Sequence, residues 1–199
     1  MIPPTPPMRP ESLSSEHGRV GAVYLTREAI AARVTELGEE IAAAYQGLDP
    51  LLLAPLKSSV VFLADLTRKL PIPHTLDVVE LAPYNGGTGD GVRLLKDVDT
   101  PLGDRHVLIV EDVVDTGLTL HFLGRTLSLR NPASLAAVTL LDRPYRRLVD
   151  GIPLRYVGFT VPDELFAGYG LGLDERWRSL PDLHVVTTVE LPSAATEAA

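Results

Sequence analysis

The chain of 199 residues contains no cysteine. That absence excludes disulfide bonds, cysteine nucleophiles and metal sites built from thiolates. Histidine is also scarce: five are scattered along the chain, and no two stand at the spacing of metal ligands on one helix. We therefore expect the histidines to lie on the surface or at the edge of the core.

Long apolar segments are missing too. No run approaches the length that would cross a membrane, and the proline-rich residues 1–12 lack the apolar stretch of a signal peptide. Basic residues are outnumbered, with 18 Lys and Arg against 26 Asp and Glu, which gives a formal net charge of −8. This balance argues against partners such as nucleic acid or an anionic membrane, but it allows a local cationic pocket for a phosphorylated small molecule. We expect a soluble, cytoplasmic protein.

Hydrophobic residues make up 45% of the chain, which is enough for the core of one domain. We expect flexible tails at residues 1–18 and 191–199 around a folded domain at 19–190. Apolar spacing and turn signals predict helices at 26–45, 60–70 and 118–130, and strands at 51–54, 76–81, 105–110 and 134–141. Strands that alternate with helices predict an α/β fold with a twisted, mainly parallel sheet flanked by helices.

Two segments do not fit this alternation. Residues 82–91 contain four glycines, as expected of a flexible linker or of a mobile lid, and inside a compact α/β domain the lid is favoured. The last fifty residues are less regular, which predicts a small hood of loops and short strands.

The segment V-L-I-V-E-D-V-V-D-T-G-L-T-L at residues 107–120 joins an apolar strand to three carboxylates, Glu111, Asp112 and Asp115. In an open α/β sheet, ligands bind beyond the carboxyl ends of the strands. The N–H groups and hydroxyls of residues 116–119 can surround a phosphate at a helix N-terminus, and carboxylates can accept hydrogen bonds from sugar hydroxyls. The alternative is that Asp115 or Thr116 only caps the helix, but three unpaired acids would contribute nothing to stability there.

This segment resembles the phosphoribosyl diphosphate signature of the type I phosphoribosyltransferases, and specifically of the hypoxanthine-guanine phosphoribosyltransferases. The resemblance extends from about residue 20 to 186. The pyrophosphate loop and its helix resemble the segment A-P-L-K-S-S-V-V-F-L-A-D-L. The segment that joins the lid to the signature strand resembles T-G-D-G-V-R-L-L-K-D-V-D-T-P-L. L-L-D-R-P-Y-R-R, Y-V-G-F-T-V-P-D-E-L-F-A-G-Y-G-L and W-R-S-L-P resemble the purine-binding hood, at about 143–186 with part of the N-terminal region.

The resemblance implies purine salvage by transfer of 5-phosphoribosyl from phosphoribosyl diphosphate to N9 of a 6-oxopurine. Hypoxanthine, guanine or both would be the purine base, and a purine nucleoside monophosphate (IMP or GMP) and pyrophosphate the products. Asp115 would exchange a proton with purine N7. Mg²⁺ would neutralise charge on the leaving diphosphate, with Glu111 and Asp112 acting on it indirectly. A homodimer or homotetramer is expected.

The remaining roles follow from the same resemblance. Glu111 and Asp112 would hold the ribose hydroxyls, and the 5-phosphate would lie against Asp115, Thr116, Gly117, Leu118 and Thr119. Pyrophosphate would contact Lys57, Ser58 and Arg178, the lid would include Pro83 and Tyr84, and the purine would face Arg143, Leu165 and Phe166.

The sequence departs from the family pattern at several of these positions. Lys57 is followed by Ser58 where the family has glycine, and Arg143 stands where the family has lysine. Gly172 occupies the position of an acidic metal ligand, and Asp174 lies two residues further on. Two alternatives therefore stay open: a regulator that senses phosphoribosyl diphosphate or nucleotide without turnover, and transfer to another base. Asp115 favours an enzyme, because a sensor needs no proton-transfer residue, and Gly172 favours the sensor.

Overall fold

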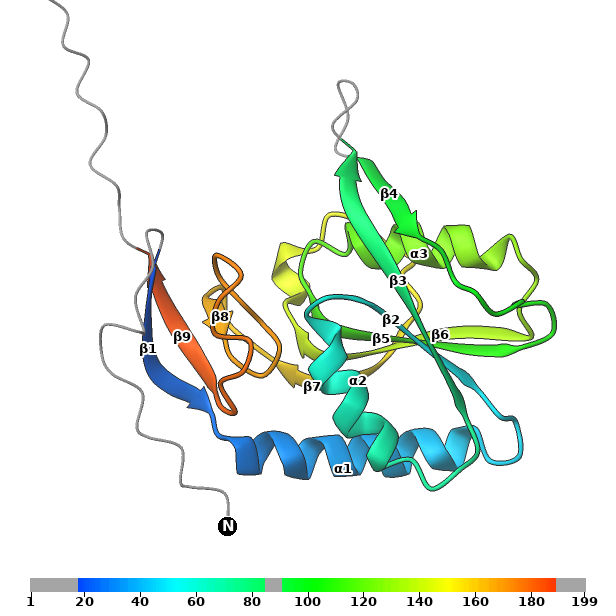
Figure 1. Ribbon diagram of the computed structural model, residues 1–199, viewed down its shortest axis with the longest axis horizontal. Coiled ribbons are helices and arrows are strands. Elements are labelled where there is room, and N and C mark those ends of the chain that lie inside the picture. The colour runs from blue at the N-terminus through cyan, green and yellow to red at the C-terminus, as the bar shows by residue number, and fades with distance from the viewer. Residues whose placement is uncertain (1–17, 85–90, 189–199) are drawn as a thin grey trace, which may run out of the picture.

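The computed structural model describes residues 18–84 and 91–188. Its centre is a six-stranded sheet in the order β4-β3-β2-β5-β6-β7 (Figure 1). The strands are β2 (Leu51–Leu56), β3 (Thr75–Tyr84), β4 (Gly91–Lys96), β5 (His106–Val114), β6 (Ser134–Asp142) and β7 (Leu154–Thr160). All neighbouring pairs are parallel except β3 and β4, so the sheet is mainly parallel, as the sequence predicted.

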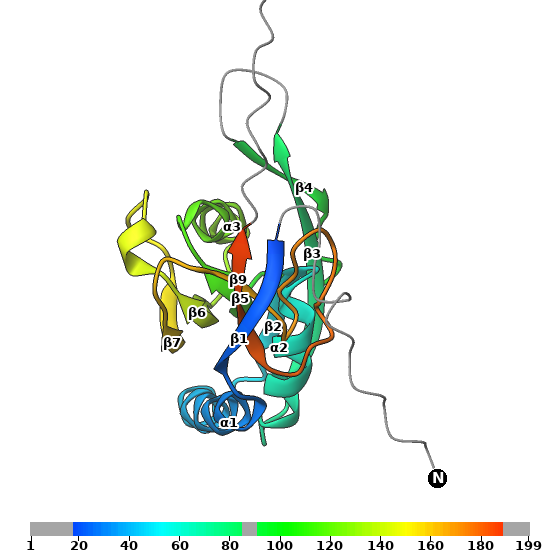
Figure 2. The same cartoon turned by 90° about the vertical axis from the view of Figure 1, so that its left-hand side faces the viewer.

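Helices cover both faces of this sheet. Helices α1 (Arg27–Ala44) and α2 (Ser59–Arg68) lie on one face, and α3 (Leu118–Ser128) lies on the other (Figures 1 and 2). The central strand β5 is buried from both sides because Leu108 and Val110 pack into the cluster beneath α1 and α2, whereas Val107 and Ile109 pack beneath α3. The run of aliphatic residues in β5 is thus explained by two layers of helix.

The helices form where the apolar spacing predicted them. The Thr26 hydroxyl caps α1 by accepting a hydrogen bond from the Ala29 N–H at 3.2 Å. The buried side of α1 carries Ile30, Val34, Leu37 and Ile41, which recur at helical spacing.

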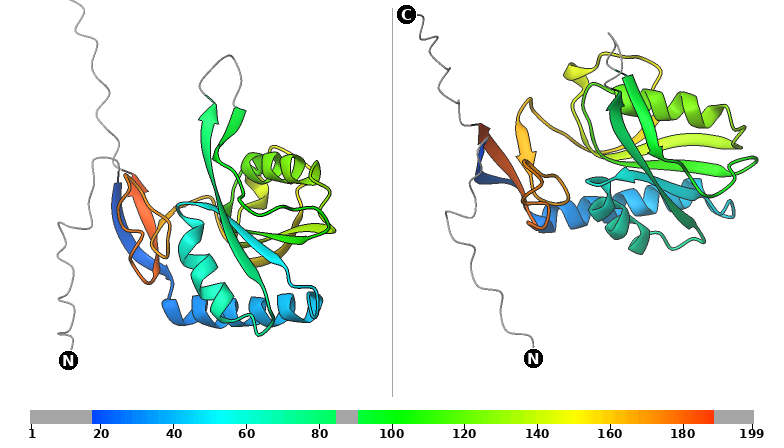
Figure 3. Two further views of the ribbon diagram at one scale, coloured as in Figure 1. Left: turned by 45° about the vertical axis from the view of Figure 1, so that its right-hand side comes forward. Right: turned by 45° about the horizontal axis from the view of Figure 1, so that its top comes forward.

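A second sheet of three antiparallel strands, in the order β1-β9-β8, stands beside the main sheet (Figure 3). It consists of β1 (Gly18–Leu25), β8 (Leu165–Ala167) and β9 (Leu183–Thr188), and we call it the hood. Its small core contains Val20, Ala167, Trp177, Leu180 and Val186. The hood therefore joins the two ends of the described chain.

The α/β class predicted from the sequence is confirmed, with one correction to the expected arrangement. Strand β7 falls inside the range 143–186 that was assigned to the hood, but it pairs with β6 in the main sheet because its apolar residues complete that sheet's edge. The predicted tails lie outside the described residues except for Gly18, which begins β1, and the centre of the predicted lid at 85–90 lies outside them as well. No helix among the described residues is long and apolar enough to span a membrane.

Candidate active site

The three signature carboxylates lie at the carboxyl end of β5, next to the hood. The strand was predicted to end at Val110, but it continues to Val114 because Glu111 and Val113 still pair with β6. Glu111 and Asp112 are therefore strand residues, and each is only 5% exposed. Asp115 follows the strand in the loop that leads to α3.

Glu111 and Asp112 share one hydroxyl donor. Ser59 Oγ lies 3.1 Å from Asp112 Oδ1 and 3.5 Å from Glu111 Oε2. Burial raises the pKa of both carboxyls, and the neighbouring charge of Asp112 raises the pKa of Glu111 further. The Ser58 and Ser59 hydroxyls oppose the shift at Asp112. Two adjacent buried carboxylates with so few donors are suited to accept hydrogen bonds from a ligand.

The loop from Asp115 to Thr119 forms the start of α3. Gly117 is the N-cap residue and has φ +82°, in the left-handed region. A Cβ at this position would lie 2.8 Å from Arg147 Cδ and 3.2 Å from Val149 Cγ2, so both the backbone angle and the space require glycine. Leu118 N donates to Thr116 Oγ1 at a long 3.4 Å, and the first N–H groups of a helix are suited to bind an anion.

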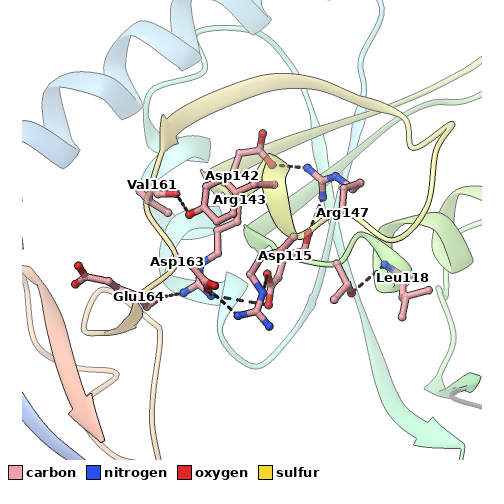
Figure 4. A network of polar contacts seen from close by, with 11 residues as sticks. Asp115, Leu118, Asp142, Arg143, Arg147, Val161, Asp163 and Glu164 are labelled. Atoms are coloured by element: carbon pink, nitrogen blue, oxygen red, sulfur yellow. Dashed lines mark hydrogen bonds and ion pairs between the residues drawn. The ribbon is translucent and has the colours of Figure 1, made fainter.

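Asp115 lies among arginine side chains from the segment after β6 (Figure 4). Arg146 Nε is 2.8 Å from Asp115 Oδ1, Arg143 Nη1 is 3.8 Å from Oδ2, and Arg147 Nη1 donates to the Asp115 carbonyl at 3.1 Å. Arg146 and Arg143 therefore place positive charge beside both oxygens of the Asp115 carboxylate.

Arg143 joins this loop to the hood. Its guanidinium donates to the Glu164 carbonyl and lies over the Phe166 ring, with Cζ 5.6 Å from the ring centroid. The Phe166 ring also contacts the Tyr24 ring, at a centroid distance of 4.8 Å. Phe166 is 6% exposed and belongs to the core, whereas Leu165 is 44% exposed. Of the two candidate residues for covering a flat base, Leu165 is therefore the one with free surface.

The third part of the site combines the loop after β2 with the hood. The Leu56–Lys57 peptide bond is cis, and Lys57 Nζ lies 3.0 Å from Glu175 Oε2. Arg178 Nη2 is 3.2 Å from the other oxygen, Glu175 Oε1. Gly170, with φ +95°, allows the close approach of the hood, since a Cβ there would lie 2.3 Å from the Ser58 carbonyl oxygen. Lys57, Ser58 and Arg178 are thus brought together from distant parts of the sequence.

The structure does not place every predicted residue in the site. Pro83 and Tyr84 lie at the end of β3, but their side chains are outside the described residues, so their role in a lid stays a prediction. Gly172 has no room for a side chain, since a Cβ would lie 2.8 Å from the Arg176 carbonyl oxygen. Among residues 18–84 and 91–188, three or more acidic or histidine side chains nowhere gather in an arrangement that could hold a metal.

The structure also adds three residues that sequence reasoning did not assign to the site. Ser59 lies between the two buried carboxylates, Arg146 pairs with Asp115, and Glu175 lies between Lys57 and Arg178. The sequence offered only an indirect signal for two of them. Arg146 lies within a segment that resembles the hood, and Glu175 stands just before another.

An acidic strand end, a glycine-capped helix start and a cationic loop lie at the carboxyl ends of parallel strands. This arrangement is typical of transferases that bind phosphorylated sugars or nucleotides. Residues 22–171 match the family model "Phosphoribosyl transferase domain", and the chain belongs to this family. The hypoxanthine-guanine phosphoribosyltransferase of Mycobacterium avium is 46% identical over 171 residues, covering 82% of this chain and 84% of that protein.

Two further relatives agree with this assignment. The hypoxanthine phosphoribosyltransferase of Escherichia coli K12 is 42% identical over 163 residues, covering 80% of this chain and 91% of that protein. A crystal structure of a hypoxanthine-guanine phosphoribosyltransferase from Bacillus anthracis superposes with a TM-score of 0.79 at 38% identity, covering 85% of this chain and 98% of that one. The family predicted from the sequence is confirmed.

Proposed function

We propose that the protein is a purine salvage enzyme that transfers 5-phosphoribosyl from phosphoribosyl diphosphate to N9 of hypoxanthine, guanine or both. The products are the purine nucleoside monophosphate and pyrophosphate. The observation that carries the proposal is the meeting of three segments at the carboxyl ends of neighbouring strands: the acidic end of β5, the loop after β2 with Lys57, and the segment after β6 with Arg143. Each supplies groups that fit a different part of the two substrates.

The ribose 5-phosphate half lies along β5 and the start of α3. The loop from Asp115 to Thr119 surrounds the 5-phosphate with N–H groups and hydroxyls at the positive end of the helix. Glu111 and Asp112 accept hydrogen bonds from the ribose hydroxyls. Their burial supports this role, because two adjacent buried carboxyl groups with few donors gain from the hydrogen bonds of the ribose hydroxyls.

The purine lies between Asp115 and the hood. Asp115 takes the proton from purine N7 as N9 forms its bond to the ribose carbon, and its position in the loop after β5, beside Arg143, supports this assignment. Arg143 donates to the 6-oxo group, held in place by the Phe166 ring and the Glu164 carbonyl. Leu165 covers the face of the base because it retains exposed surface, whereas Phe166 supports Arg143 from the core.

The leaving pyrophosphate binds to Lys57, Ser58 and Arg178. The donor set at this edge fits Mg²⁺ only as a shared ion: Glu111 and Asp112 are two carboxylates, and no third acidic group joins them among the described residues. Mg²⁺ is commonly held by one or two carboxylates together with phosphates and water, so the substrate's own oxygens would supply the remaining ligands. When bound, Mg²⁺ neutralises charge on the diphosphate.

The test is an assay in which the full chain is mixed with phosphoribosyl diphosphate, Mg²⁺ and hypoxanthine, guanine, xanthine or adenine in turn. We expect nucleotide to form with hypoxanthine or guanine. Nucleotide formed only with adenine would assign the enzyme to another base. Binding of phosphoribosyl diphosphate with no nucleotide from any base would support the alternative of a sensor, which the absence of an acidic residue at Gly172 favours. A homodimer or homotetramer remains the expected assembly.

A further inference from the structure

Glu175 places a carboxylate between the two cations of the pyrophosphate site. Its Oε2 atom lies 3.0 Å from Lys57 Nζ, and its Oε1 atom lies 3.2 Å from Arg178 Nη2. Lys57 follows β2, 118 residues earlier in the chain, so this contact joins the core domain to the hood. Each carboxylate oxygen thus accepts one hydrogen bond from a different cationic group, which is the pattern that two oxygens of a diphosphate would form.

The side-chain contacts of Glu175 lie at the surface and not in the hydrophobic core. Its side chain is 67% exposed, and so is much of Lys57, so water has access to the pair. The turn that carries Glu175 is closed by a separate backbone bond from Arg176 N to Leu173 O at 2.9 Å. Exposed ion pairs of this kind contribute little to folding. These ion pairs therefore contribute little to stability and leave the Lys57 side chain accessible to a ligand.

We propose that Glu175 is an internal competitor for the pyrophosphate site: its carboxylate occupies Lys57 and Arg178 in the free protein and is displaced when a diphosphate binds. The inference rests on the proposed function, in which these two cations hold the leaving group. It assigns to Glu175 the control of affinity for the diphosphate half of the substrates, because its two hydrogen-bond partners are Lys57 and Arg178.

The charge state of Glu175 fits this role. The hydrogen bond from Lys57 and then the charge of Arg178 lower the pKa of its carboxyl, so the competitor is ionised across the neutral range. Because the pairs are exposed, a ligand with several negative charges can replace the single carboxylate readily. The displaced group returns when pyrophosphate leaves, which speeds release of this product.

The experiment measures binding of inorganic pyrophosphate with Mg²⁺ to the full chain by calorimetry. Glu175→Gln keeps the size of the side chain and removes its charge, and we expect affinity roughly 3- to 30-fold higher than in the wild type, from the loss of two exposed ion pairs. Binding of the purine nucleoside monophosphate should stay unchanged. Glu36→Gln is the matched control, since it removes the same charge from another exposed ion pair, with Arg33 at 2.8 Å, and should leave both affinities unchanged.

Two outcomes overturn the proposal in different ways. Equal or weaker pyrophosphate binding by Glu175→Gln would mean that Glu175 positions Lys57 and Arg178 rather than competing for them. Lys57→Ala tests the site itself: it should weaken pyrophosphate binding and spare the monophosphate. If Lys57→Ala left pyrophosphate binding unchanged, the pyrophosphate site would be wrongly assigned. The proposal that Glu175 competes for that site would then be wrong as well.

Discussion

The adjacent buried carboxylates Glu111 and Asp112 lead to a prediction about stability and function together. Both are only 5% exposed, and in the described structure they share the Ser59 hydroxyl. Glu111→Gln preserves the shape of the side chain and removes one of the two charges. We expect this variant to be more stable than the wild type at neutral pH and to bind phosphoribosyl diphosphate less well.

The sign of the stability change follows from the direction of the pKa shift of Glu111. Burial, and after it the charge of Asp112, raises the pKa of Glu111 well above its ordinary value of 4.5. A raised carboxyl pKa contributes stability that is complete below pH 4.5 and is lost as the pH rises through the folded-state pKa. Stabilising single substitutions are commonly worth on the order of 1–2 kcal/mol, and we expect Glu111→Gln to gain about that much at pH 7.

Thermal unfolding of both proteins between pH 4 and pH 8 measures this gain. It corresponds to a midpoint roughly 2–8 °C higher at pH 7 for a chain of this size, and the difference should shrink toward pH 4. Saturating phosphoribosyl diphosphate should narrow the gap at pH 7, because Glu111 then gains its ribose partners. Glu36→Gln, on an exposed pair, should change stability by less than about 0.5 kcal/mol at every pH. A gain that did not vary with pH, or a loss, would refute the reasoning.

Three further predictions concern single residues of the site. Asp115→Asn should lower turnover by roughly 10²–10⁴-fold with little change in phosphoribosyl diphosphate affinity, and near-normal turnover would remove Asp115 from proton transfer. Gly117→Ala forces a side chain into φ +82° and against Arg147. Denaturant titration should therefore show a free energy of unfolding lower by roughly 1–2 kcal/mol, and monophosphate binding should weaken. An unchanged free energy of unfolding would contradict the expected backbone strain. Gly172→Asp should lower the Mg²⁺ concentration needed for half-maximal activity. It should also lower stability, because its Cβ would lie 2.8 Å from the Arg176 carbonyl oxygen. An unchanged Mg²⁺ requirement would show that position 172 does not reach the metal.

The four inner strands of the main sheet were predictable because their signals are local, whereas the edge strands β4 and β7 were not predicted as part of it. Aliphatic runs such as Val107 to Val110 mark strands that two helical layers bury, and apolar residues at helical spacing mark α1. The end of β5 was placed too early, since Glu111 and Asp112 were read as following the strand. Pairing with β6 keeps these acids in the strand despite their charge, and that pairing is not visible in the local sequence.

The hood strands were harder to predict because they depend on contacts between distant residues. Strand β1 pairs with β9 across the whole length of the chain, from Gly18 opposite Thr188 to Leu25 opposite Leu183. Much of β1 is exposed, so its sequence lacks the strong alternation of a half-buried strand. Strand β8 has only three residues, too few for any periodicity to be recognised.

The site shows the same division between local and distant information. The signature residues could be named because they are consecutive, but the charges that balance them come from elsewhere in the chain. In the free protein Asp115 faces Arg146, while Lys57 and Arg178 face Glu175. In the proposed reaction the substrates replace these ion pairs with their own, so binding does not require a pocket lined only by cations. A chain with a net charge of −8 can in this way hold a diphosphate without presenting a strongly basic surface.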